Sequence, residues 1–233
     1  MNKTTVGVII AIVAIFGGMV IYSAVQNSQK TVDYETYNAA GVISDEANSG
    51  GIAEHVRGKA DSRVVVVEYA DFQCPGCASM MPKMNTLYEE YKDQVAFVFR
   101  HYPISGHQNA RSAAAASEAA GLQGYFWEMA EALYDNRTDW IYESGSERTQ
   151  KYISIFEQAA PDGDVAAFQD AITNNKDLEK KINFDLNIGK NLSKVQATPS
   201  FYVNGEYVTI GDQDSLDDLM NNIKAKIDEH LAK

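Results

Sequence analysis

The sequence predicts an α/β fold with an inserted helical segment, preceded by one membrane-spanning helix. Two apolar, β-branched runs, residues 63–72 and 95–103, flank a segment with helical spacing of its apolar residues. Helical patterns then dominate from about residue 105 to 192, after which the period returns to two and a final amphipathic helix closes the chain. The predicted order is therefore β–α–β, an all-helical insertion, and β–β–α.

Composition limits the class of protein and its partners. The chain has 233 residues, of which 45% are hydrophobic and 22% charged, which is enough for one good-sized core. Its formal net charge of −12 argues against a surface that follows nucleic-acid phosphates. We therefore expect no nucleic-acid partner.

The N-terminus predicts a membrane anchor. Residues 6–25 are apolar and uncharged, and a helix needs about 20 such residues to cross a bilayer. The alternative is a cleaved signal peptide, whose apolar core is usually about 7–15 residues. Lys3 favours a cytoplasmic stub, residues 1–5. We expect a single-pass protein of the cell membrane with its folded domain on the extracytoplasmic side, or a secreted protein if the signal is cleaved.

A polar segment follows the anchor. Residues 26–52 are rich in Ser, Asn and Gly and show no sustained period. This composition predicts a flexible linker. The folded domain is then expected at residues 53–232, with its helical insertion at about 105–192.

The elements of that domain follow from periodicity and turn residues. The run at 63–72 fits a strand buried on both faces, and a helix with Pro82 inside it connects this strand to the next. Strands joined in this way should be parallel. Near the C-terminus, Asn204-Gly205 predicts a tight antiparallel hairpin, because both residues tolerate positive φ.

Only two cysteines are present, Cys74 and Cys77, separated by Pro75 and Gly76. A structural zinc site needs about four ligands, and the sequence has no second cysteine pair and only scattered histidines. Haem attachment requires a histidine after the second cysteine, where Ala78 stands. Zinc, haem and inert packing stay open as alternatives, but redox chemistry is the main interpretation.

The placement of the pair supports thiol–disulfide exchange. Cys74 follows a buried strand at the start of a helix, where free N–H groups and the helix dipole stabilise a thiolate. Cys77 lies one turn later and can resolve a mixed disulfide. Pro75 suits the first helical turn, and Gly76 leaves the approach to the sulfurs open. The expected redox group is the cysteine pair itself, with no metal and no separate cofactor.

Glu68 interrupts the valine run six residues before Cys74. Burial would raise the pKa of this carboxyl, which could then exchange a proton with Cys77. The alternative is a glutamate at the strand end that pairs with Lys or Arg.

Thr198-Pro199 opens the strand that leads into the hairpin. A proline at a strand start marks an edge or a special feature, and exposed backbone there can pair with an extended substrate. The residues alone do not predict a cis bond, because most X-Pro bonds are trans.

Three stretches together resemble the DsbA-like branch of the thioredoxin superfamily: "VVVVEYADFQCPGC" (64–77), "VFRHYPISGHQNARSAAAASEAAGLQGYFWEMAEALYDN" (98–136) and "ATPSFYVNG" (197–205). The similarity extends over about residues 52–232. It implies a thioredoxin fold with a helical insertion, in which Cys74 is the exposed nucleophile and Glu68 the buried acid. It also implies a cis Pro199 beside the disulfide. The best-known oxidases have a histidine where this chain has Gly76, which leaves its oxidising strength open.

These observations predict a membrane-tethered thiol:disulfide oxidoreductase that introduces disulfides into exported proteins with free cysteines. A membrane redox partner would reoxidise it. One alternative is a reductase or isomerase fed by a membrane electron donor, and another is a tethered peptide-binding chaperone module. The expected catalytic residues are Cys74, Cys77 and Glu68, and the expected substrate-binding residues are Thr198, Pro199, Pro75 and Gly76.

Overall fold

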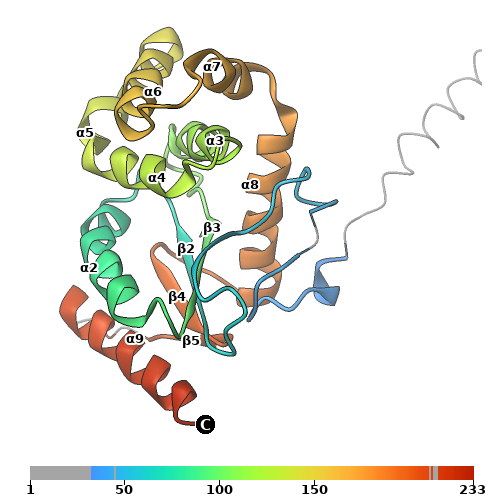
Figure 1. Cartoon of the computed structure of the whole chain (residues 1–233), viewed down its shortest axis with the longest axis vertical. Coiled ribbons are helices and arrows are strands. Elements are labelled where there is room, and N and C mark those ends of the chain that lie inside the picture. The colour runs from blue at the N-terminus through green and yellow to red at the C-terminus, as the bar shows by residue number, and fades with distance from the viewer. Residues whose placement is uncertain (1–32, 45, 210, 212–214) are drawn as a thin grey trace, which may run out of the picture. The chain divides into compact units, whose positions relative to one another are not determined.

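A mixed β-sheet forms the centre of the domain (Figure 1). The computed structural model describes residues 33–44, 46–209, 211 and 215–233. Within them the sheet has five strands in the order β1-β3-β2-β4-β5. Their bounds are β1 His55–Gly58, β2 Val65–Ala70, β3 Ala96–His101, β4 Ser200–Val203 and β5 Glu206–Tyr207.

The predicted β–α–β unit and hairpin are confirmed. β2 and β3 are parallel and are joined by α2 (Pro75–Tyr91), which continues through Pro82. β4 pairs antiparallel with β2 and with β5. The turn between β4 and β5 has φ of 47° at Asn204 and 81° at Gly205, as a primed turn requires. The sequence analysis missed β1, a four-residue edge strand too short to show a period.

Helices fill the interval between β3 and β4, where the sequence predicts the helical insertion. A further helix, α9 (Leu216–Leu231), follows β5 with a capping box at Ser215 and Asp218. The helices of the interval are α3 Ala110–Gly121, α4 Phe126–Asp135, α5 Arg137–Trp140, α6 Gly145–Ala159, α7 Val165–Asn174 and α8 Lys176–Ile188, followed by one turn of π-helix, η2 Gly189–Ser193.

The two faces of the sheet are covered by different elements (Figure 1). Val66 on one face packs in a cluster with Leu87 of α2 and Ile223 of α9. Val67 on the other face packs in a cluster with Ile188 of α8. A third cluster joins the helical insertion to the first turn of α2, and it contains both cysteines. The reactive pair therefore lies where the insertion meets the sheet.

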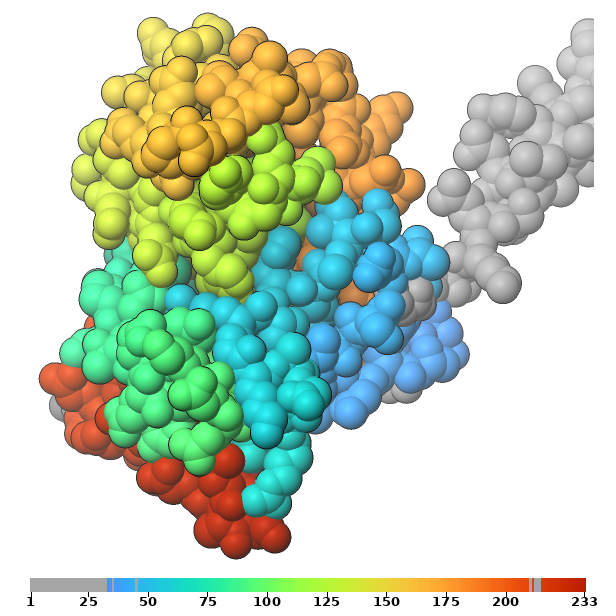
Figure 2. Space-filling view, in the orientation of Figure 1, coloured from blue at the N-terminus to red at the C-terminus, as the bar shows by residue number. Residues whose placement is uncertain are grey.

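The described part of the segment before β1 packs against this body, so the predicted flexible linker is wrong for residues 34–44 and 46–52. Ile43 is buried in the same cluster as Val67. Tyr37 makes an edge-on ring contact with Phe184 of α8, at 5.1 Å between centroids. In Figure 2 this segment, in blue, lies against the neighbouring surface. Residues 26–32 of the predicted linker and the predicted anchor at 6–25 lie outside the described residues.

No helix in the described part of the chain is both long enough and apolar enough to span a membrane.

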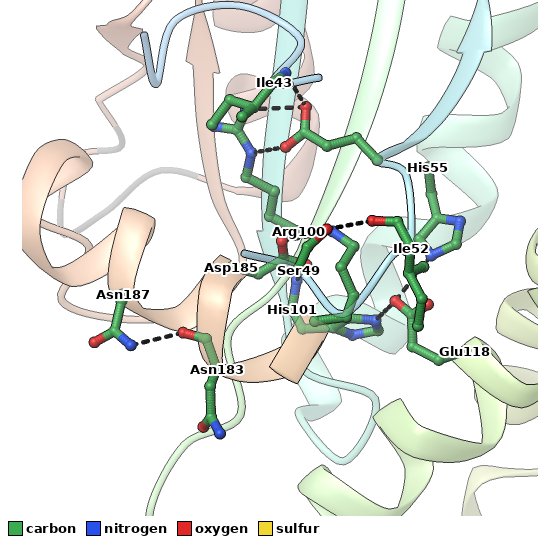
Figure 3. Close-up of polar contacts among 12 residues, drawn as sticks. Ile43, Ser49, Ile52, His55, Arg100, His101, Glu118, Asn183, Asp185 and Asn187 are labelled. Carbon is green, nitrogen blue, oxygen red and sulfur yellow. Dashed lines mark hydrogen bonds and ion pairs between the residues drawn. The ribbon is translucent and has the colours of Figure 1, made fainter. Parts of the chain in front are cut away.

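Arg100 of β3 explains why the segment before β1 is ordered (Figure 3). Its side chain is fully buried, and Glu54 accepts two hydrogen bonds from it at 2.5 and 3.2 Å. The same guanidinium donates to the carbonyl oxygens of Ala39, at 2.8 Å, and Gly41, at 2.7 Å. Glu54 also accepts a hydrogen bond from the backbone N–H of Ile43. The buried guanidinium of Arg100 thus provides hydrogen-bond partners for the segment before β1. The polar composition of that segment does not predict these partners.

We predict that Arg100→Met lowers the free energy of unfolding by about 3 kcal/mol or more, because it leaves the Glu54 carboxylate buried without its cation. Urea unfolding at neutral pH measures this change. Arg111→Met is the matched control, since the ion pair between Arg111 and Glu179 is exposed and its loss should cost less than about 1 kcal/mol. Equal effects of the two substitutions would contradict the role given to Arg100.

Candidate active site

Cys74 lies at the N-terminal end of α2, directly after the loop that leaves β2. It has extended backbone angles and is the N-cap residue, and Pro75 is the first residue of the helix. A proline at this position loses no helical hydrogen bond. The backbone N–H groups of Gly76 and Cys77 in this first turn help to lower the pKa of Cys74.

The two sulfurs have unlike environments. Cys74 is 8% exposed and Cys77 is 1% exposed, so the expected exposure of Cys74 holds only relative to Cys77. Both are free thiols in the structure. The pKa of Cys74 is lowered to about 5, chiefly because the Cys77 thiol hydrogen-bonds to its sulfur, with further help from the backbone N–H groups of Cys77 and Gly76. Cys74 is therefore a thiolate at neutral pH.

Cys77 is held in the opposite state. Burial raises its pKa well above the ordinary thiol value, and the hydrogen bond to Cys74 and the charges of Cys74 and Glu68 raise it further. The pair thus carries one proton at neutral pH, and that proton is on Cys77.

The loop before β4 lies against the Cys74 sulfur. The Thr198–Pro199 peptide bond is cis, as the resemblance implied. The carbonyl oxygen of Thr198 is 3.3 Å from Cys74 Sγ and accepts a hydrogen bond from the thiol when it is protonated. The hydroxyl oxygen of Thr198 is buried and has no hydrogen-bond partner among the described residues. Pro199 and Thr198 are thus beside the reactive sulfur, where the sequence placed them.

Gly76 allows this close approach. A Cβ at this position would lie 3.3 Å from Pro199 Cδ and 3.7 Å from Cys74 Sγ. A larger residue would have to push the proline loop aside or turn away from it. Pro75, in contrast, is exposed at the surface next to Cys74.

Glu68 is a partly buried residue in the middle of β2, between Phe99 of β3 and Phe201 of β4. Burial raises its pKa to about 7, and the nearby charge of Arg57 opposes this increase. Its charge is felt by Cys77. Glu68 has no ion pair or hydrogen bond within the described part of the chain, which disfavours the alternative of a simple Lys or Arg pair.

The sequence analysis treated Asp71 only as a loop marker, but its buried carboxylate organises the approach to the cysteines. Oδ1 accepts a hydrogen bond from the backbone N–H of Gln73 at 2.7 Å. Oδ2 accepts one from the N–H of Ile104 at 2.9 Å and pairs with His107 Nδ1 at 2.7 Å. The Asp71 carbonyl also accepts the N–H of Cys74. The signal available in the sequence was an acidic residue, Asp71, three residues before Cys74.

The helical insertion holds the residue that precedes Cys74. Arg137 of α5 donates from Nε and Nη2 to the Gln73 carbonyl oxygen, at 2.8 and 2.5 Å. The Gln73 side chain accepts the backbone N–H of Asn109 and donates to the carbonyl of Ile141. No local pattern in the sequence indicates these contacts, because residues about 36 to 68 positions apart form them.

One group of three described residues has ligand atoms close enough to hold a metal ion: His55, His101 and Glu118, within 4.8 Å of one another. Glu118 Oε1 instead accepts hydrogen bonds from His55 Nε2, at 2.8 Å, and His101 Nε2, at 2.7 Å (Figure 3). The ammonium group of Lys181, which is buried in an ion pair with Asp185, also interacts electrostatically with Glu118. These hydrogen bonds connect β1, β3 and α3, and the cluster is separate from the cysteines.

Comparison with known families gives one match over most of the chain. The family model described as thioredoxin matches residues 51–225. A protein of Bacillus cereus called probable disulfide bond formation protein D is 31% identical over 212 residues, which is 84% of this chain and 89% of that protein.

Other relatives are much longer. The Na(+)/H(+) antiporter NhaA 1 of Mycolicibacterium vanbaalenii is 34% identical over 155 residues, which is 65% of this chain. The chain spans only 23% of the length of that antiporter.

Solved structures agree on the fold. Oxidised BdbD from Bacillus subtilis superimposes with a TM-score of 0.64 and 22% identity, over 83% of this chain and all of that one. DsbA2 from Pseudomonas aeruginosa gives a TM-score of 0.58 and 25% identity, over 75% of this chain and 94% of that one.

We predict that Cys77→Ala raises the pKa of Cys74 from about 5 by about 1 unit or more, because it removes the largest stabilisation of the thiolate. Titration of the thiolate ultraviolet absorbance in the reduced protein measures this pKa. Cys77→Ser is the control, because its hydroxyl keeps a donor and should give a smaller increase. A Cys74 pKa that is the same in all three proteins would show that the thiol of Cys77 is not what stabilises the thiolate.

Proposed function

The chain belongs to the thioredoxin family, and we propose that it is an extracytoplasmic thiol:disulfide oxidoreductase that introduces disulfides into exported proteins. The observation that carries the proposal is the pair of thiols with opposite pKa shifts at the start of α2, beside a cis proline. Reactive cysteines have lowered pKa values, whereas purely structural buried cysteines do not. The names of the Bacillus cereus relative and of the DsbA structure support the same chemistry.

The first half of the reaction uses the Cys74–Cys77 disulfide. A client thiolate attacks the Cys74 sulfur, the bond between the two enzyme sulfurs breaks, and a mixed disulfide of Cys74 with the client forms. Cys77 leaves as a thiolate in an environment that strongly favours the protonated state. Glu68, with a pKa of about 7, carries a proton in roughly half of the molecules at pH 7 and can supply it to Cys77.

The second half releases the client. A second client thiolate attacks the client sulfur of the mixed disulfide, and Cys74 leaves as a thiolate. A leaving thiol with a low pKa leaves faster, so the lowered pKa of Cys74 favours this step. The client has lost two electrons, and the enzyme pair is now reduced with one proton on Cys77.

The client would bind along the loop that contains the cis proline. Ala197 is exposed and Thr198 is partly buried beside the Cys74 sulfur, so their backbone is suitably placed to pair with an extended peptide. Pro75 and Gly76 form the opposite side of this approach and present little side-chain bulk to the client. Such backbone pairing would accept many client sequences.

The proposed location and partners rest on sequence features. The apolar run at residues 6–25 supports a membrane anchor with the domain outside the cytoplasm, where disulfides persist. Each turnover leaves the enzyme reduced, so an oxidant is needed to restore the Cys74–Cys77 disulfide, and a membrane redox partner is the proposed source. Exported proteins with pairs of reduced cysteines are the proposed clients.

Client trapping tests this function. We predict that Cys77→Ala accumulates mixed disulfides with exported proteins, because its Cys74 thiolate attacks a client disulfide and the enzyme then has no thiol of its own to displace the client again. Cys74→Ala should trap none, and the double substitution provides the background. Non-reducing gels of cells that express each variant show the adducts. Equal trapping by both single variants, or trapping by neither, would contradict the assigned roles.

A further inference from the structure

A cleft lies between the loop that follows β3 and the segment that joins α8 to β4. Its volume is about 580 Å³, within the range of pockets that hold ligands. The loop contributes Ile104 and His107, and the first turn of α3 contributes Arg111. Lys190 and Gln196 come from the segment after α8. Residues that are far apart in the sequence thus meet at one cleft.

The lining of this cleft is basic, although the chain as a whole is acidic. The full sequence has 32 acidic residues against 20 Lys and Arg, for a formal net charge of −12. None of the described residues that line the cleft is acidic, whereas Arg111 and Lys190 bring two positive charges to it. The cleft also adjoins the N-terminal end of α3, where the helix dipole adds positive potential. This combination favours a negatively charged ligand.

Both cations keep donors that a ligand can use. Arg111 donates from Nη2 to Glu179 Oε2 and to Asn183 Oδ1, and its Nε and Nη1 have no hydrogen-bond partner among the described residues. Lys190 is exposed, and its ammonium group forms no ion pair or hydrogen bond within the same part of the chain. A carboxylate suits these groups, because its two oxygens accept hydrogen bonds from a guanidinium and an ammonium together.

Two of the lining segments also border the reactive sulfur. On one wall, His107 Nδ1 is paired with Asp71, whose carbonyl oxygen accepts the backbone N–H of Cys74. On the other wall, Gln196 is exposed and lies two residues before Thr198, whose carbonyl oxygen is 3.3 Å from Cys74 Sγ. The cleft is therefore next to the loop along which a client is proposed to bind.

The length of that loop determines which client residue meets the cleft. An extended chain advances about 3.3–3.6 Å per residue, so two residues span about 7 Å. A client cysteine bonded to Cys74, with its backbone paired along Ala197 and Thr198, would place a residue two or three positions away beside Gln196. A carboxylate on that client residue would enter the basic lining.

We propose that this cleft is a client-recognition site, in which Arg111 and Lys190 bind a carboxylate two or three residues from the reacting cysteine of an exported protein. This inference rests on the proposed function and adds a preference to it. Backbone pairing beside the cis proline accepts many client sequences, whereas two cations in the adjoining cleft distinguish acidic segments from neutral and basic ones.

An exchange equilibrium with glutathione tests the preference. The full chain with Cys77→Ala carries glutathione on Cys74, and a single-cysteine peptide displaces it, giving the protein–peptide disulfide and free glutathione. Peptides with Glu three residues before or after the cysteine are compared with otherwise identical Gln peptides by mass spectrometry, each corrected for its own exchange with glutathione disulfide. We expect the Glu peptide of one series to be favoured by about fivefold at low ionic strength. The ratio should fall toward one in about 1 M salt.

Variants of the cleft complete the test. Lys190→Gln combined with Arg111→Gln should abolish the preference, whereas Lys151→Gln, which removes an exposed charge from α6 outside the cleft, should keep it. The same measurements in a Cys77→Ser background guard against a loss of folding in Cys77→Ala.

Equal binding of the Glu and Gln peptides in both series overturns the proposal, as does a preference that survives the double substitution. The equilibrium requires only the Cys74 thiol. A wild-type protein that fails to oxidise a dithiol peptide would therefore count against the proposed function and leave the result for the cleft intact.

Discussion

The hydrogen bond from the Cys77 thiol to the Cys74 sulfur is the interaction on which the chemistry of this domain depends. Two adjacent sulfurs cannot both be ionised at neutral pH, since like charges repel in a buried site. Burial decides which sulfur keeps the proton, and it selects Cys77. The proton on Cys77 then stabilises the thiolate of Cys74 at the helix N-terminus. The Thr198 loop and Glu68 act on these two unlike sulfurs from opposite sides.

The fold holds that pair from three directions. The end of β2 and the buried Asp71 fix the loop that carries Cys74. The helical insertion reaches the same loop through Arg137 and Gln73, so it contributes to the active site as well as covering it. The Arg100–Glu54 pair fastens the segment before β1 to the sheet on the other side of the core. Displacement of Asp71 or Arg137 would move the loop that carries Cys74.

Local signals in the sequence sufficed for the central elements of the fold and the site. The valine run, the two cysteines at helical spacing, and Asn204-Gly205 each depend on residues close together in the chain, and the structure agrees with all three. The predictions that were wrong or missing concern contacts between residues that are far apart in the sequence. The polar composition of residues 34–52 suggested a flexible linker because the partner that orders them, Arg100, is far away in sequence. Arg137 was missed for the same reason, whereas β1 was missed because its four residues are too few to show a period.

The reduction potential of the Cys74–Cys77 pair tests the central claim most directly. Stabilisation of the Cys74 thiolate stabilises the reduced form, which makes the disulfide a stronger oxidant. We therefore predict a potential between about −200 and −120 mV, measured by equilibration with glutathione at pH 7. A value near about −270 mV, typical of thioredoxin, would contradict the oxidising role and favour a reductase.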